Sequence, residues 1–201
     1  MSVEQKNLWR VFCAVELPPD VKERVARRTV RLRETVPDAR AAWERTEKLH
    51  LTIKFLGEIE RARVEALGRA AERAASGVEP FELTIEGAGA FPPRGLPRVI
   101  WLGVRDASGL LAKLRQRLED ECAAENFPRE RRDFNPHLTL ARLRAPADAR
   151  RLADLHLATP LESVSFEVPE LVVIRSELGP GGSRHTILTR HELKARSHPN
   201  G

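Results

Sequence analysis

The stretch HLTI at residues 50–53 recurs as HLTL at residues 137–140, so a histidine followed two positions later by a threonine occurs in both places. Both stretches lie in short runs of apolar, β-favouring residues, which predicts strands. Because side chains on a strand alternate between its two faces, the histidine and the threonine of each copy share one face. Two such strands brought side by side about a pseudo-two-fold axis would direct both histidines and both threonines into one cleft.

The repeated residues suit chemistry at a phosphate ester. Hydrolysis or transesterification at phosphorus needs a base for the attacking oxygen and an acid for the leaving oxygen, and histidine can serve as either near neutral pH. His50 and His137 are therefore the candidate acid and base. The hydroxyls of Thr52 and Thr139 can donate hydrogen bonds to the non-bridging phosphate oxygens, whose charge grows in the transition state. These four side chains cover the chemistry, so neither a metal nor a cofactor is expected.

Length and composition indicate an ordinary globular protein. With 201 residues, 41% hydrophobic and 31% charged, the chain can form one compact domain or two small lobes that share an interface. Cys13 and Cys122 are too few for a disulfide framework and lack zinc-site spacing, so free thiols are expected. The chain starts without a signal-like segment and has no apolar stretch that could span a bilayer, so a cytoplasmic protein is expected. The net charge of +5 is compatible with a polyanionic partner.

The hydrophobic pattern alternates strands with helices along the whole chain. Strands are expected at residues 8–17, 43–57, 81–85, 98–104, 137–143, 161–174 and 185–191, with a turn near Glu47 and Lys48 inside the second of these stretches. Helices are expected at residues 20–36, 60–76, 108–126 and 146–157, and a glycine-rich turn at residues 179–183. No linker or low-complexity segment divides the chain.

HLTIKFLG at residues 50–57 and NPHLTLARL at residues 135–143 resemble the paired His-x-Thr-x motifs of the two-histidine (2H) phosphoesterase superfamily. The closest resemblance is to its RNA 2',3'-cyclic phosphodiesterase branch, historically called 2'-5' RNA ligases. The likeness extends to WRVFCAVELP at 9–18, PRVIWLGV at 97–104 and RSELGPGGSRHTIL at 175–188, and so spans almost the whole chain. Two matched motifs in the right order are far more specific than one.

The resemblance implies one α+β domain over residues 1–201, with two pseudo-symmetric lobes whose antiparallel sheets flank a central cleft and whose helices lie outside. It implies hydrolysis of RNA 2',3'-cyclic phosphate ends to a 2'-phosphate. His50 would donate a proton to the ribose 3'-oxygen, His137 would activate water, and Thr52 and Thr139 would bind the phosphate. The implied partners are RNA ends or cyclic nucleotides, with no membrane, and a monomer is expected.

Several basic residues near the motifs are candidates for substrate binding. Lys54 shares the face of His50 if the strand is regular, whereas Arg142 lies on the face opposite His137 and reaches the cleft only if its strand twists or ends there. A cluster of arginines just before the second motif could contact RNA phosphates, although charge runs are usually only solvated. The cluster consists of Arg129, Arg131 and Arg132.

Other functions stay open at the level of sequence. Another 2H enzyme could act on a cyclic nucleotide or on a cyclic phosphate of ADP-ribose, and a non-catalytic RNA-binding module could use the same scaffold, although both histidines are present. Without an ATP site, ligation could only be attack on the cyclic phosphate by a 5'-hydroxyl, which water at about 55 M opposes. One departure from the family is His185, where a tyrosine is common; it is expected to change local packing or nucleobase contact.

Overall fold

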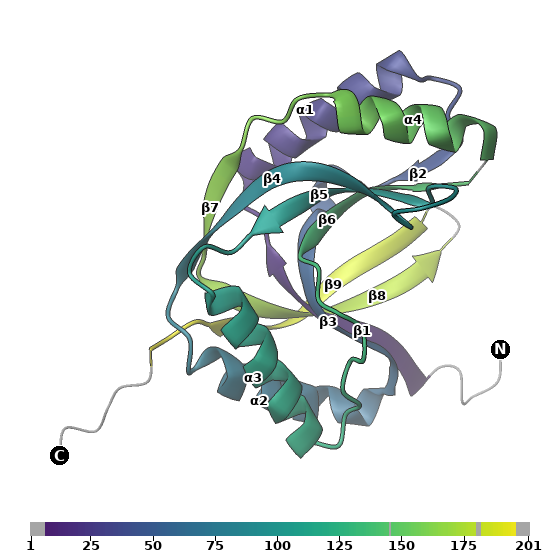
Figure 1. Cartoon of the computed structure of the whole chain (residues 1–201). Coiled ribbons are helices and arrows are strands. Elements are labelled where there is room, and N and C mark those ends of the chain that lie inside the picture. Colours follow the sequence, from purple (N-terminus) through teal and green to yellow (C-terminus); the bar gives the residue numbers. More distant parts are fainter. Residues whose placement is uncertain (1–6, 145, 180–181, 196–201) are drawn as a thin grey trace.

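The protein is α+β, with its strands in two antiparallel sheets and its helices on their outer sides. The structure is a computed structural model that describes residues 7–144, 146–179 and 182–195. The helices are α1 (Pro19–Thr35), α2 (Val64–Ala75), α3 (Leu110–Ala124) and α4 (Pro146–Ala158). Figure 1 shows α1 and α4 outside one sheet, and α2 and α3 outside the other. The expected fold class is confirmed.

The first sheet, here called sheet A, contains the strand of the first motif at its edge. Its strands, in spatial order, are β3 (His50–Glu60), β1 (Leu8–Glu16), β8 (Glu170–Gly179) and β9 (Gly182–Glu192). On β1, Val11, Cys13 and Val15 lie in the main core together with the buried sides of α2 and α3, whereas Phe12 and Ala14 belong to a small separate cluster. This alternation gives sheet A an outer face under the helices and an inner face toward the other sheet.

The second sheet, sheet B, contains the strand of the second motif. Its strands, in spatial order, are β2 (Ala41–Trp43), β6 (His137–Leu143), β5 (Val99–Arg105), β4 (Phe81–Phe91) and β7 (Val164–Val168). Neighbouring strands are antiparallel. Leu138 and Leu140 of β6 are fully buried in the main core, so the outer face of sheet B is apolar. The histidine and the threonine of the second motif are left on its inner face.

The chain passes between the two sheets more often than the sequence predicted. The turn expected near Glu47 and Lys48 is present as a 3-10 turn at Thr46–Lys48, but the strands before and after it, β2 and β3, lie in different sheets. The expected strand at 161–174 is likewise split at Pro169 into β7 of sheet B and β8 of sheet A. The division at Pro169 and both changes of sheet were not predicted, because a change of sheet does not interrupt the apolar pattern of the strands. No single point along the chain separates the strands of sheet A from those of sheet B.

Candidate active site

The strand of the first motif is bulged directly after its threonine. Along β3, Thr52 pairs with Ala14 and Lys54 pairs with Cys13, so Ile53 has no partner of its own on β1. An extra residue of this kind is a β-bulge, and it reverses the alternation of faces beyond it. Lys54 and Phe55 therefore point to the faces opposite those expected for a regular strand, until a second bulge at Leu56 restores the alternation.

The strand of the second motif is bulged at the corresponding position. Along β6, Thr139 pairs with Trp101 and Ala141 pairs with Ile100, which leaves Leu140 as the extra residue. The two motifs thus share both their sequence and a backbone irregularity one residue after the threonine. Bulges are common beside active sites, where they redirect side chains.

His50 is fixed from both sides of its ring. Its Nδ1 lies 2.6 Å from the backbone oxygen of Lys48, and its Nε2 lies 3.1 Å from Oγ1 of Thr52. The ring stacks on Phe12 at a centroid distance of 4.8 Å and meets the edge of His185 at 5.3 Å. Because Nδ1 must donate its proton to the carbonyl, the neutral ring has its lone pair on Nε2, beside the threonine hydroxyl.

His137 is held in the same manner. Its Nδ1 lies 2.7 Å from the backbone oxygen of Asn135, again two residues earlier, so that Nε2 has the lone pair of the neutral ring. Phe91 and Trp101 contact its ring edge to face, at centroid distances of 5.2 and 6.0 Å. Trp101 lies across Gly89, where a Cβ atom would come within 2.1 Å of the indole, so a glycine is required there. Each histidine therefore has a pinned tautomer and two ring neighbours.

The surroundings of His50 disfavour positive charge. Burial lowers its pKa, and Lys22 acts in the same direction, whereas the carbonyl of Lys48 and the carboxylate of Glu16 oppose this. Burial also lowers the pKa of His185 to about 4, with help from His50 and Lys48. Both rings are therefore neutral in the free protein at neutral pH.

The two motif strands approach each other, and a cavity opens beside the first of them. Cα atoms of β3 and β6 come within 8 Å. The cavity has a volume of about 430 Å³, and its lining includes Glu16, Arg45, Lys48, His50, Arg184 and His185. His137 is not part of this lining. The space beside His50 is thus mixed in charge and large enough for part of a nucleotide.

The prediction that Lys54 shares a face with His50 was wrong, because the bulge turns its side chain to the other side of the sheet. Lys54 is 3% exposed, and its Nζ lies 2.7 Å from Oε2 of Glu119 and 2.8 Å from the backbone oxygen of Pro128. A buried ammonium that is held by a carboxylate and a backbone oxygen does not reach a ligand in the cleft. The proposed substrate-binding role of Lys54 is therefore withdrawn.

The bulge in β6 has the opposite effect on Arg142, because it turns this side chain toward the inner face of sheet B. This residue pairs with Val99, which shares the face of Trp101 and therefore of His137. The strand is not regular, so Arg142 lies on the inner face, which is the condition under which it was expected to reach the cleft. Its side chain is exposed.

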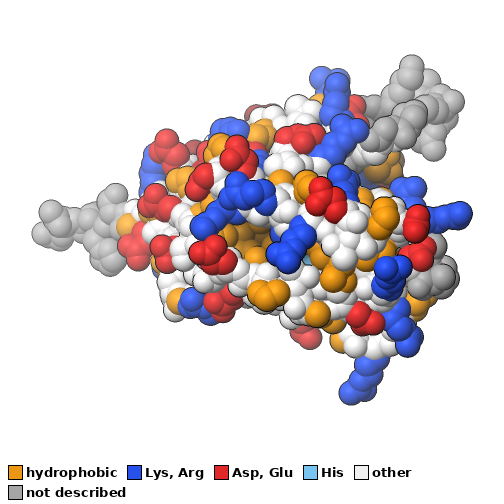
Figure 2. Space-filling model, turned by 90° about the horizontal axis from the view of Figure 1, so that it is seen from above, with side chains coloured by type: hydrophobic (Ala, Val, Ile, Leu, Met, Phe, Trp, Pro, Cys, Tyr) orange, Lys and Arg blue, Asp and Glu red, His pale blue; other side chains and the backbone are white. Residues whose placement is uncertain are grey.

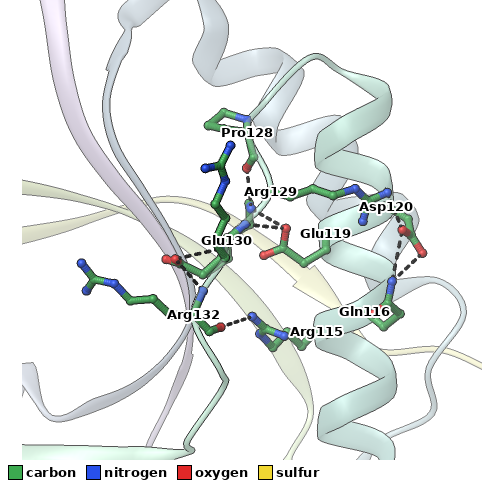
Figure 3. A network of polar contacts seen from close by, with 10 residues as sticks. Arg115, Gln116, Glu119, Asp120, Pro128, Arg129, Glu130 and Arg132 are labelled. Atoms are coloured by element: carbon green, nitrogen blue, oxygen red, sulfur yellow. Dashed lines mark hydrogen bonds and ion pairs between the residues drawn. The ribbon is translucent and has the colours of Figure 1, made fainter.

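The three arginines before the second motif differ in their surroundings (Figure 3). Arg129 points to α3, where it forms an exposed ion pair of 2.8 Å with Asp120. Arg131 and Arg132 are exposed, and their backbone N–H groups donate to one carboxylate oxygen of Glu130, at 3.1 and 3.3 Å. The side chain of Arg132 extends away from α3. In the described residues, the guanidinium groups of Arg131 and Arg132 have no acidic partner.

The outer face over α1 and α4 has no continuous basic surface. In Figure 2, which views this face, Lys and Arg side chains alternate with Asp and Glu.

Among residues 7–144, 146–179 and 182–195, no group of three His, Cys, Asp or Glu side chains is placed to hold a metal ion. Within the same residues, no helix is long and apolar enough to cross a membrane.

Several contacts of the site were not foreseen from the sequence. Phe12, Phe91 and Trp101 touch the two histidines, and His185 lies against His50. The available signal was weak: aromatic residues on neighbouring strands are expected to be either core or site residues, and only strand register separates the two.

Comparison with known proteins gives a consistent result over most of the chain. An RNA 2',3'-cyclic phosphodiesterase of Methanothermobacter thermautotrophicus is 34% identical over 180 residues, covering 88% of this chain and 95% of that protein. Among solved structures, TT0787 of Thermus thermophilus matches with a TM-score of 0.76 and 27% identity, covering 94% of this chain and all of the other. E. coli LigT complexed with 3'-AMP matches with a TM-score of 0.70 and 29% identity, covering 92% of this chain and 98% of the other.

A family model supports the same conclusion. The model described as the 2'-5' RNA ligase superfamily matches residues 17–180, a range that includes both motifs. The match confirms the resemblance inferred from the paired motifs, and the names of the relatives confirm the expectation of an enzyme. The chain belongs to the 2'-5' RNA ligase superfamily.

Proposed function

We propose that the enzyme opens 2',3'-cyclic phosphate ends of RNA with water, giving a 2'-phosphate and a free 3'-hydroxyl. The observation that carries the proposal is the matched setting of His50 and His137. In both, Nδ1 is committed to a backbone oxygen two residues earlier, so proton exchange falls to Nε2, which in His50 lies 3.1 Å from the hydroxyl of Thr52. The names of the curated relatives support the same reaction.

In the proposed mechanism, His137 acts as the base. Its Nε2 lone pair takes a proton from water as the water oxygen bonds to phosphorus, and the bond from phosphorus to the ribose 3'-oxygen breaks. His50 gives a proton to that 3'-oxygen. The hydroxyls of Thr52 and Thr139 donate hydrogen bonds to the non-bridging oxygens, where negative charge accumulates.

The lowered pKa of His50 links substrate binding to the protonation that the mechanism needs. In the free enzyme, burial favours the neutral ring. A cyclic phosphate monoanion placed beside Nε2 favours the charged ring instead, because an opposite charge at close range raises the pKa of a histidine. The anionic substrate therefore helps to create the acid that cleaves it.

RNA ends are the preferred substrate class because of the side chains around the motifs. Arg131, Arg132 and Arg142 are exposed and could bind phosphates beyond the scissile one. Phe91 and Trp101 offer aromatic surface beside His137 on which a nucleobase could stack. Arg129 is a weaker candidate since it has an acidic partner. We retain a monomer, cytoplasmic location and no membrane partner as parts of the proposal.

Ligation is proposed only as a minor reaction of the same site. A 5'-hydroxyl in place of water would attack the cyclic phosphate, with His137 again as base and His50 as acid, and would form a 2'-5' linkage without ATP. Water at about 55 M favours hydrolysis.

The test is to incubate the purified enzyme with a nucleoside 2',3'-cyclic phosphate and with an oligonucleotide that carries the same end. The expected product in both reactions is the 2'-phosphate, identified by chromatography against 2'- and 3'-phosphate standards. Binding of the oligonucleotide without turnover would instead indicate an RNA-binding module. Turnover of a cyclic phosphate of ADP-ribose but of neither RNA substrate would indicate another 2H phosphodiesterase.

A further inference from the structure

The buried side chain of Lys54 connects the strand of the first motif to the segment that leads into the second. Its Nζ donates to Oε2 of Glu119 at 2.7 Å and to the backbone oxygen of Pro128 at 2.8 Å. Oε2 of Glu119 also accepts the backbone N–H of Glu130 at 3.2 Å. Figure 3 shows Glu119 on α3 pointing to the chain at Pro128 and Glu130.

These contacts link the strand of His50 to the segment that precedes His137. Lys54 lies on β3, shortly after His50 and directly after the bulge. Residues 128–136 lie between α3, which ends at Ala124, and β6, where His137 is the first residue. A rigid connection between Lys54 and Pro128 therefore joins the strand of one histidine to the segment that delivers the other.

The surroundings of the pair exclude water, which makes the connection rigid. Lys54 is 3% exposed and Glu119 is 5% exposed. Burial raises the pKa of the neighbouring thiols, for Cys122 to about 11, and Lys54 and Glu119 also act on both thiols. Moving either partner would leave the other charge buried and unpaired, which is strongly unfavourable.

One carboxylate oxygen of Glu119, Oε2, accepts the hydrogen bonds that link Lys54 to the segment at residues 128–136. Oε2 accepts both the Lys54 ammonium and the Glu130 N–H, whereas the buried Oε1 has no hydrogen-bond partner among the described residues. The hydrogen bonds of Oε2 therefore hold the start of the segment at residues 128–136. The exposed ion pair of Arg129 with Asp120 touches the same segment but is expected to be weak.

Further along, the segment is held by other elements. Arg115 of α3 donates to the backbone oxygen of Arg132 at 3.4 Å and lies over the ring of Phe134 at 4.8 Å. Val104 of β5 donates its N–H to the oxygen of Pro136 at 3.1 Å. The segment is therefore held at both ends. Lys54 holds the end at Pro128 and thereby connects the segment to β3, the strand of the first motif.

We propose that Lys54 and Glu119 are positioning residues that set the place of His137 relative to His50. The proposal rests on the proposed function, in which these two histidines act together. Loss of the connection should slow the chemical step, because a small misplacement of an acid or a base costs much of its effect. Binding of a mononucleotide should change little, because neither residue reaches the cleft.

The experiment compares variants that separate the connection from the fold. Lys54→Met/Glu119→Leu removes both charges and replaces them with apolar side chains, which avoids an unpaired buried ion. Lys54→Met/Glu119→Gln also removes both charges but keeps an acceptor for the N–H of Glu130. Asp120→Asn is the matched control, since it removes an exposed contact with the same segment from the next residue of α3.

The measurements are Tm, kcat and KM with a nucleoside 2',3'-cyclic phosphate. Both double variants should keep a Tm close to that of the wild type, with kcat lowered by about tenfold or more and KM changed by less than about twofold. Asp120→Asn should leave kcat unchanged. If the first double variant does not fold, the second supplies the test.

A folded double variant with wild-type kcat would overturn the proposal, and so would a loss of kcat in Asp120→Asn equal to that in the double variants. If the wild type itself leaves the cyclic phosphate intact, the proposed function fails instead. The positioning role is then read from the imidazole NMR signals of His137, which should shift in the double variants and not in Asp120→Asn. Unchanged signals in the double variants would refute it.

Discussion

Acid should destabilise this protein through one buried histidine on α4. His156 is fully buried, its Nε2 lies 2.9 Å from the backbone oxygen of Trp101, and Nη2 of Arg28 lies 3.5 Å from its Nδ1. Burial lowers its pKa to about 4; the contact with the Trp101 carbonyl opposes this shift, and the positive charge of Arg28 adds to it. The ring is therefore neutral in the folded protein over most of the physiological range.

The sign and size of the effect follow from the two pKa values. The unfolded chain takes up a proton at His156 near pH 6.5, whereas the folded protein does so near pH 4. Between these values the unfolded state binds more protons, so the stabilisation is complete above pH 6.5 and decreases as the pH falls toward 4. By pH 4.5 the loss from this one residue is about 2–3 kcal/mol.

The assay is urea unfolding at pH 7.5 and at pH 4.5, for the wild type and for His156→Gln. The glutamine amide can still donate to the oxygen of Trp101 but does not titrate. His50 and His185 also have lowered pKa values, and their contribution is common to both proteins. The wild type should lose about 2–3 kcal/mol more than the variant on acidification. Equal losses in the two proteins would refute the argument.

Three further predictions concern the proposed reaction. Thr52→Ala and Thr139→Ala should each slow turnover by about ten- to a thousandfold, and wild-type rates in both would show that the threonines only form strand. Dialysis against a strong chelator should leave turnover unchanged; loss of activity that magnesium or manganese restores would contradict a metal-independent mechanism. Replacement of Arg131 and Arg132 with alanine should weaken oligonucleotide binding. The slope of log binding constant against log salt concentration should fall by about 0.7 per lost phosphate contact, and an unchanged slope would show that both arginines are only solvated surface residues.

The paired motifs were accessible from sequence because they depend only on local alternation. His50 and Thr52 share a face, as do His137 and Thr139, and the register of each pair on its neighbouring strand agrees with this. The fold class followed from the resemblance of the whole chain to one family. The individual elements were also mostly in place, since each depends on a short periodic pattern.

The faces of residues beyond the motifs were not accessible. Ile53 and Leu140 are the extra residues of two bulges, yet both are ordinary β-branched or aliphatic residues that a regular strand would also contain. Counting alternate positions therefore placed Lys54 in the cleft, where it does not lie, and Arg142 on the far side. A bulge is set by pairing with a neighbouring strand, and pairing is not visible in one sequence.

The contacts between distant strands were inaccessible for the same reason. Phe12 reaches His50 from β1, and Phe91 reaches His137 from β4, so both contacts depend on strand order in the sheets. The changes of sheet after residue 43 and at Pro169 were equally hidden. A proline between two apolar strands was the one local sign of the second change.

The central claim is that His50 donates a proton to the 3'-oxygen while His137 activates water. The most direct test is kcat/KM of the wild type, His50→Ala and His137→Ala on a nucleoside 2',3'-cyclic phosphate and on its analogue with sulfur in place of the 3'-oxygen. On the oxygen substrate each variant should lose about 10²- to 10⁴-fold. A 3'-thiolate leaves without protonation, so the sulfur substrate should rescue His50→Ala and leave His137→Ala inactive. Rescue of His137→Ala alone would reverse the two roles, and wild-type rates in either variant would contradict the mechanism.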